Sequence, residues 1–85
     1  MSDSITFEIV RNVGVIEEYP TGWKKELNVI AWNGNEPKYD IRDWNPEHTH
    51  MSRGITFEMK MAKKLASCLK ADIEKEECEN ETDSI

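Results

Sequence analysis

The sequence predicts an α+β domain in which four antiparallel strands are followed by one C-terminal helix. Apolar and polar residues alternate along most of the first 57 residues, as in strands that have one buried face. Turn sequences interrupt this alternation at regular intervals. After residue 57 the apolar residues recur with the helical period of 3.6 instead of 2. Eighty-five residues are enough for one small domain, which we expect to cover residues 1–76.

The alternating segments and the turns between them define the expected strands. They cover residues 5–18, 23–33, 37–44 and about 53–57. Residues 19–22 (YPTG) and 33–35 (NGN) are strong turn signals, so the first three strands should form consecutive hairpins. Gly14 predicts a bulge or a bend in the first strand. One parity of that strand is apolar and comprises Phe7, Ile9, Val13 and Val15.

Residues 58–76 are expected to form an amphipathic helix. Its apolar face would carry Ala62, Leu65, Ala66, Leu69 and Ile73. This stripe can pack on the chain's own sheet or against the helix of a second copy. One sheet with one helix makes a thin core, so we expect a homodimer that pairs through the helices. Residues 77–85 are polar, acidic and free of aromatic residues, which predicts a disordered tail.

The net charge of −6 is concentrated at the C-terminal end of the chain. Residues 72–85 contain seven acidic residues and one lysine, so they account for all of this charge. Residues 1–71 hold ten residues of each sign and are neutral. The acidic balance therefore does not exclude a local basic surface that binds nucleic acid.

The sequence shows no pattern typical of secretion, membrane insertion or cofactor binding. Residues 1–20 lack an apolar run behind a basic start, and no segment approaches the roughly 18 apolar residues of a membrane span. Cys68 and Cys78 match neither a zinc pattern nor a disulfide framework. We expect a cytoplasmic protein without a cofactor, a membrane partner or a small-molecule substrate.

The strand expected over residues 37–44 carries the main functional signal. Alternation places Lys38, Asp40, Arg42 and Trp44 on one face, and Tyr39, Ile41 and Asp43 on the other. Single-stranded nucleic acid presents phosphates and unpaired bases, so two cations and an indole on one face indicate a surface that binds it. Alternatively, Trp44 is an anchor of the core. Arg42 would then be a structural ion-pair partner of Asp40 or Asp43.

Further candidates flank this strand. Trp23 and Trp32 stand nine residues apart near the ends of the second strand, so a regular strand places them on opposite faces. One of them would stack on a base, and the other would pack inside the protein. Phosphate contacts are expected from Arg42 and from Lys24, Lys25, Lys38 and Arg53.

No catalytic or metal site is expected. His48 and His50 lie in a loop without a third ligand at a suitable spacing. The sequence contains no Ser-His-Asp pattern and no glycine-rich phosphate loop. Two alternatives to a nucleic-acid-binding protein stay open. One is a protein-interaction module whose sheet binds a protein partner, and the other is a small metal-dependent nuclease that uses the two histidines.

Several sequence blocks resemble the positive cofactor four (transcriptional coactivator p15) family, and most closely its bacterial YdbC-type branch. The blocks are residues 22–28 (GWKKELN), 32–33 (WN), 37–44 (PKYDIRDW) and 53–56 (RGIT). They occur in order and at compatible spacing within residues 5–72. The resemblance implies a curved sheet, a homodimer built through the helices, and non-catalytic binding of single-stranded DNA with little sequence preference.

The resemblance leaves some questions of function open and points to particular residues. It does not separate DNA from RNA, nor transcription regulation from replication or repair. The positions that this family uses for DNA correspond here to Arg42, Trp44 and the basic residues of the second strand and of the loop before the fourth. That loop is less basic than in eukaryotic members, because residues 47–50 comprise Glu47, a threonine and two histidines.

Overall fold

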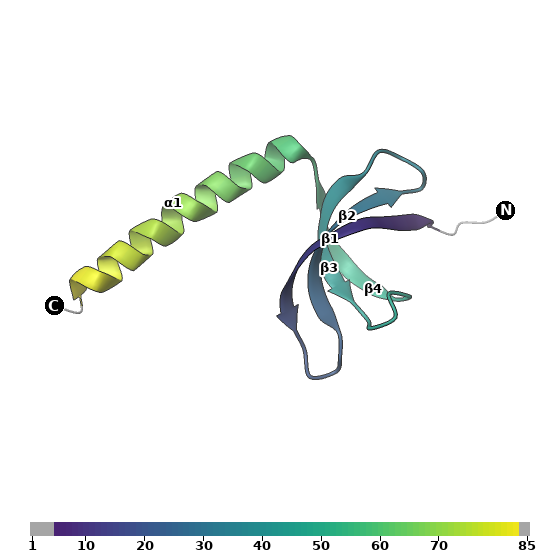
Figure 1. Cartoon of the computed structure of the whole chain (residues 1–85), viewed down its shortest axis with the longest axis horizontal. Helices are drawn as coiled ribbons and strands as arrows, with labels where there is room; N and C mark the ends of the chain where they lie inside the picture. The colour runs from purple at the N-terminus through teal and green to yellow at the C-terminus, as the bar shows by residue number, and fades with distance from the viewer. Residues whose placement is uncertain (1–4, 84–85) are drawn as a thin grey trace.

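The computed structural model describes residues 5–83, and the side chains of residues 5–77, as a four-stranded sheet with one helix (Figure 1). The strands are β1 (Phe7–Glu18), β2 (Lys24–Trp32), β3 (Lys38–Trp44) and β4 (Met51–Phe57), and the helix is α1 (Met59–Asp83). The strands lie in the order β1-β2-β3-β4, and each pairs antiparallel with the next. The predicted ββββα architecture is confirmed.

The hairpin connections follow the turn signals of the sequence. Asn33 and Gly34 have positive φ angles of 51° and 76°, as a tight Asn-Gly hairpin turn requires. The amide of Asn35 donates to the carbonyl of Trp32 at 2.8 Å and closes this turn. At the first hairpin, Gly22 also has a positive φ, of 94°, which suits a residue without a Cβ.

Helix α1 is longer than the apolar pattern predicts. It continues through residues 77–83, where the sequence predicts a disordered tail, and residues 84 and 85 lie outside the described part. No glycine or proline follows Gly54, so the composition contains no residue that would end the helix earlier. Among the described residues, no helix is both long enough and apolar enough to cross a membrane.

Strand β1 contains three register shifts against β2, and one of them lies between Asn12 and Gly14. The bulge predicted at Gly14 is therefore confirmed. Each inserted residue reverses the side on which the following side chains point. Val13 consequently lines the apolar cleft beside the helix, whereas Ile9 and Val15 lie on the other face with Glu26. The expectation that Ile9, Val13 and Val15 share a face is wrong for this reason.

The sheet curls strongly toward one of its two faces. Glu26 lies opposite Arg42 in the β2–β3 register, and it is six residues from Trp32, or about 20 Å along a straight strand. Arg42 Cζ nevertheless lies 4.7 Å from the centre of the Trp32 ring. The Phe7 ring of β1 lies 5.8 Å from Trp32 and 5.2 Å from Trp44. We call this side the concave face.

The buried core of the protein lies on the concave face of the sheet. Alternation assigns to this face Lys24, Glu26, Asn28, Ile30 and Trp32 of β2, and Lys38, Asp40, Arg42 and Trp44 of β3. Four of these side chains are fully buried: Ile30, Trp44, Asn28 and Asp40. Two of the four are polar and need hydrogen-bond partners inside the protein. The packed part of the domain is therefore formed by the curled sheet and not by the helix.

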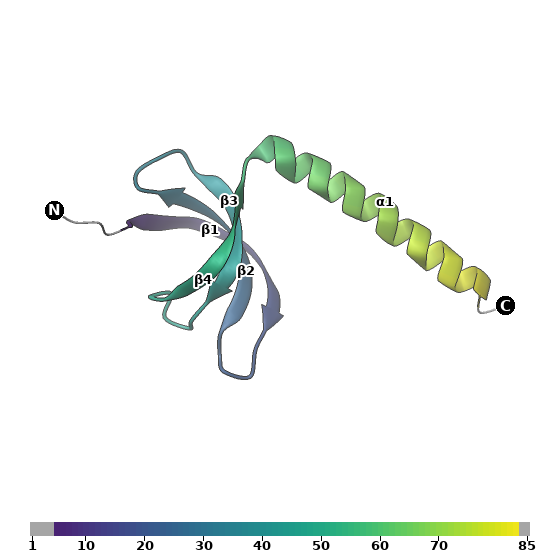
Figure 2. The same cartoon turned by 180° about the vertical axis from the view of Figure 1, so that it is seen from behind.

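The opposite, convex face is apolar and only partly covered. It carries Leu27, Val29, Tyr39, Ile41, Ile55 and Phe57. Helix α1 leaves the end of β4 and projects away from the sheet, as the reverse view also shows (Figure 2). The radius of gyration is 16.7 Å, against about 12 Å for a compact chain of this length. The apolar stripe of α1 stays open, with Leu69 52% and Ile73 50% exposed.

Candidate nucleic-acid interface

Arg42 and Asp40 form a paired charge at the middle of the concave face. The guanidinium donates through Nε to Asp40 Oδ1 and through Nη2 to Asp40 Oδ2, both at 2.7 Å. Thr56 Oγ1 donates to Asp40 Oδ2 at 2.8 Å. The Asp40 side chain is fully buried and that of Arg42 is 14% exposed. The charge of Arg42 is thus neutralised by a buried carboxylate, as the alternative of a structural ion pair predicts.

Two neighbours hold the Arg42 side chain in this position. The Trp32 ring lies under the guanidinium at 4.7 Å, a distance suited to a cation–π contact. On the adjacent strand Gly54 lies opposite Arg42, and a Cβ at that position would collide with Ile41 O and with Arg42 Cβ. A side chain at residue 54 would therefore force Arg42 away from its partners. Arg42 Nη1 also donates to the carbonyl of Ser52 at 3.2 Å.

Trp44 is a core residue in this structure. Its side chain is fully buried, and its ring contacts those of Phe7 at 5.2 Å and His48 at 5.5 Å. A base can stack only on an exposed π-face. The burial of Trp44 matches the alternative that it anchors the core, and it does not fit the prediction that Trp44 stacks on a base.

Trp23 and Trp32 lie on opposite sides of the sheet, as their spacing predicts. Trp32 shares the concave face with Arg42. Trp23 precedes β2 and lies beside Tyr19 and Asp43 near the first hairpin turn. Both side chains are partly exposed. Trp32 is therefore the partly exposed tryptophan that belongs to the Arg42 cluster.

The predicted phosphate-binding lysines of the sheet differ in their surroundings. Lys25 Nζ donates to Asp43 Oδ1 at 2.9 Å, and Tyr19 Oη donates to the same oxygen at 3.1 Å. The hydrogen bond to Asp43, followed by that to Tyr19, raises the pKa of Lys25 above its ordinary value, so this ammonium stays charged at neutral pH. Lys38 Nζ lies 3.7 Å from the carboxylate of Glu58, and both side chains are largely exposed.

Two predicted cations have no counter-charge among the residues whose side chains are described. Lys24 lies on the concave face near Glu26 but forms no ion pair with it. Arg53 is exposed on the edge strand β4. Of the predicted phosphate-binding cations, these two are therefore the most available to a phosphate.

A second polar cluster on the concave face has no counterpart in the predictions. His48 Nε2 lies 3.0 Å from both carboxylate oxygens of Glu26, which is buried. Asn28 Nδ2 donates to Glu26 Oε1 at 3.1 Å, and Asn12 Nδ2 donates to Asn28 Oδ1 at 2.8 Å. This chain of contacts ties the loop before β4 to strands β2 and β1. Its members are far apart in the sequence, so only the strand register reveals it.

The two histidines do not come together as a metal site. His48 faces Glu26, whereas His50 Nδ1 lies 3.1 Å from Thr49 Oγ1. Among the side chains that the structure describes, no group of three His, Cys, Asp or Glu residues could hold a metal ion.

A curled antiparallel sheet with an Arg–Asp–Trp cluster on its concave face and a projecting amphipathic helix defines a small sheet-based binding domain. Residues 19–68, more than half of the chain, match the family described as transcriptional coactivator p15 (PC4). An uncharacterised protein of Treponema pallidum (strain Nichols) is 41% identical over 57 residues, which make up 67% of this chain and 67% of that protein. The chain belongs to the transcriptional coactivator p15 (PC4) family, and the predicted resemblance is confirmed.

Proposed function

We propose that this protein is a homodimeric, non-catalytic binding protein for single-stranded nucleic acid, with little sequence preference. One observation carries the proposal. A partly exposed tryptophan and an arginine share the concave face of the sheet in a chain of the transcriptional coactivator p15 family. An aromatic surface next to cations matches the two features that every single strand offers, unpaired bases and phosphates.

The concave face supplies different contacts to the base and to the backbone. Trp32 would stack on a base. Arg42, which Asp40 holds in place, would fix the orientation of the indole through its contact with the ring. Lys24, Lys38 and Arg53 would contact phosphates from the rim. Such contacts carry no sequence information, which supports a low sequence preference.

A homodimer is supported by the apolar surface that a single chain leaves open. The cleft between the convex face and α1 is lined by Ile16, Ile41, Leu65 and Leu69 among other apolar residues. Ile16 is 57% and Leu69 is 52% exposed. A second copy that covers this face and the helical stripe would bury apolar area that water otherwise contacts. The concave faces of the two copies would stay free for two strands.

The process served is transcription regulation, replication or repair, in the cytoplasm. Family membership supports a coactivator-like role, and the concave face does not distinguish among these processes. Nor does a sheet that stacks bases and contacts phosphates distinguish DNA from RNA.

The proposal is tested by tryptophan fluorescence with three ligands of equal length. We expect oligo-dT to quench the emission at micromolar concentration, and a duplex of the same length to compete weakly. Oligo-rU then reports whether RNA is also bound. Failure of oligo-dT to bind below about 100 μM, a free energy weaker than about −5.5 kcal/mol, would favour a protein-interaction module instead.

A further inference from the structure

Among the side chains that the structure describes, more cations without an ion-pair partner lie on the helix than on the sheet. Three cations of the sheet face a carboxylate: Arg42 faces Asp40, Lys25 faces Asp43 and Lys38 faces Glu58. Residues 59–71, in contrast, contain four lysines and no acidic residue. A phosphate chain that leaves the concave face would therefore find its strongest attraction at the start of α1.

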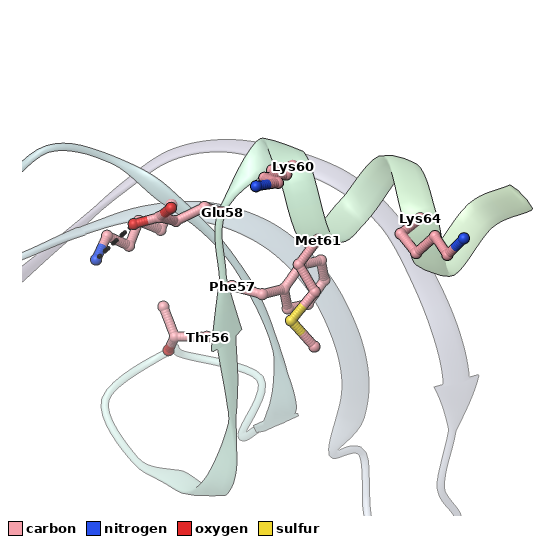
Figure 3. Close-up of a pocket in the computed structure, with 7 residues that line it drawn as sticks. Thr56, Phe57, Glu58, Lys60, Met61 and Lys64 are labelled. Atoms are coloured by element: carbon pink, nitrogen blue, oxygen red, sulfur yellow. Dashed lines mark ion pairs between the residues drawn. The ribbon is translucent and has the colours of Figure 1, made fainter. Parts of the chain in front are cut away.

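Part of this charge surrounds an open pocket where β4 meets α1. The pocket has a volume of about 630 Å³. Its lining comprises Lys38, Thr56, Phe57, Glu58, Lys60, Met61 and Lys64. We call it the junction pocket. Figure 3 shows Lys60 and Lys64 on the helix, and Phe57 and Met61, which line the same pocket, below its first turn.

The junction pocket is continuous with the Arg42 cluster. Thr56 lines the pocket and also donates to Asp40, the carboxylate that holds Arg42. Lys38 lines the pocket and belongs to the concave face. A single strand bound over Arg42 can thus cross Thr56 and reach the helix without leaving the protein surface.

The position of the helix lysines also suits this role. Lys60 and Lys64 are four residues apart and share one side of α1. This side is opposite to the apolar stripe of Leu65 and Leu69, so helix pairing in a dimer would leave both ammonium groups in water. The first turn of α1 carries no acidic side chain, and the Glu58 carboxylate just before it lies 3.7 Å from Lys38 Nζ, so the positive end of the helix dipole adds to the attraction for an anion.

We propose that the junction pocket binds backbone phosphates of the same single strand that the concave face holds. The inference rests on the proposed function and extends the binding site from the sheet onto α1. Lys60 and Lys64 are the phosphate ligands, and Met61, which is 46% exposed, offers an apolar contact to the sugar or base between them. The helix thereby supplies the basic charge that the loop before β4 lacks.

Two variants that each remove two positive charges from the helix test this proposal. Oligo-dT is titrated at several salt concentrations into the parent, K60Q/K64Q and the control K70Q/K75Q, whose lysines lie further along the same helix. We expect K60Q/K64Q to bind about tenfold more weakly at low salt. The slope of log K against log salt should fall in magnitude by about 1.4, since each neutralised phosphate of a single strand contributes about 0.7. The control should keep the parent's slope.

The outcomes distinguish phosphate binding in the junction pocket from binding by the concave face. K60R/K64R keeps the charge and should bind like the parent, and circular dichroism checks that every variant is folded. The proposal is overturned if K60Q/K64Q keeps the parent's slope, or if the control loses as much as K60Q/K64Q does. Either result would leave oligo-dT binding by the parent intact. If the parent itself does not bind oligo-dT, the proposed function fails and the pocket fails with it.

Discussion

Arg42 contacts the Trp32 ring at 4.7 Å although its strand partner, Glu26, lies six residues away from Trp32. The contact exists only because β2 bends toward the concave face. The same guanidinium is held by Asp40 through two hydrogen bonds of 2.7 Å. The position of the one partly exposed tryptophan on this face thus depends on the curvature of the sheet and on a buried ion pair.

Asp40→Asn should destabilise the protein strongly. The substitution keeps the shape of the side chain but removes the charge opposite a guanidinium that is 14% exposed. Breaking a buried pair in this way costs about 3 kcal/mol, because the remaining charge is left without compensation. Urea unfolding measures the loss. Asp43→Asn is the control. Its partner Lys25 is more exposed than Arg42, so this substitution should cost clearly less. Equal losses in the two variants would contradict the structural role of Asp40.

Gly54→Ala should displace Arg42. The added methyl group would collide with Ile41 O and Arg42 Cβ, so the guanidinium must move or the strands must separate. We expect a loss of about 1–3 kcal/mol in the free energy of unfolding, together with a change in tryptophan fluorescence. Gly14→Ala is the matched control, because a Cβ at residue 14 meets no atom within 4 Å. A G54A protein as stable as G14A would show that the close approach of β4 to Arg42 is not required.

Trp32 and Trp44 should respond in opposite ways to substitution. Trp32→Ala removes the proposed stacking surface, so oligo-dT affinity should fall by about 1–3 kcal/mol. Trp44→Phe shortens a fully buried side chain, so it should lower the melting temperature and leave the affinity unchanged. Affinity and melting temperature measured on both variants check this. A W44F protein that is stable but does not bind would restore the prediction that Trp44 contacts a base.

Leu69→Glu should separate the proposed dimer. Leu69 is 52% exposed in the single chain and lies on the apolar stripe of α1, so a dimer would bury a new charge there in both copies. Ser67→Glu adds the same charge on the opposite side of the helix and should leave the dimer intact. Sedimentation equilibrium measures the mass of each variant. A parent protein that is already monomeric at high concentration would contradict pairing through the helices.

Local patterns in the sequence were sufficient for the order of elements. The Asn33-Gly34 pair predicts its hairpin because positive φ angles suit these residues, and the structure has them at 51° and 76°. The nine-residue spacing of Trp23 and Trp32 predicts opposite faces in the same local way. Gly14 also marked the bulge, but the earlier register shift between Ile9 and Arg11 places Val13 on the other side from Ile9, and no local rule predicts such a shift.

Contacts that depend on the curl of the whole sheet could not be predicted. Twist and bulges add up over many residues before Arg42 reaches Trp32, and alternation alone cannot show that Trp44 lies under Phe7. His48 contacts Glu26 from a loop in which the histidine has a positive φ of 61°, a conformation that is uncommon for a residue other than glycine. Residues 59–71 contain four lysines and no acidic residue, but the sequence alone does not show that Lys60 and Lys64 lie in the same pocket as Thr56.

The salt dependence of oligo-dT binding tests the central claim most directly. Fluorescence titrations of the parent between about 50 and 200 mM salt should show quenching that weakens steadily as salt rises, with a log–log slope of about −0.7 for each phosphate that is neutralised. The quenching should be lost in Trp32→Ala, the variant without the partly exposed indole of the concave face. Binding that does not change with salt, or no binding up to about 100 μM, would contradict the account.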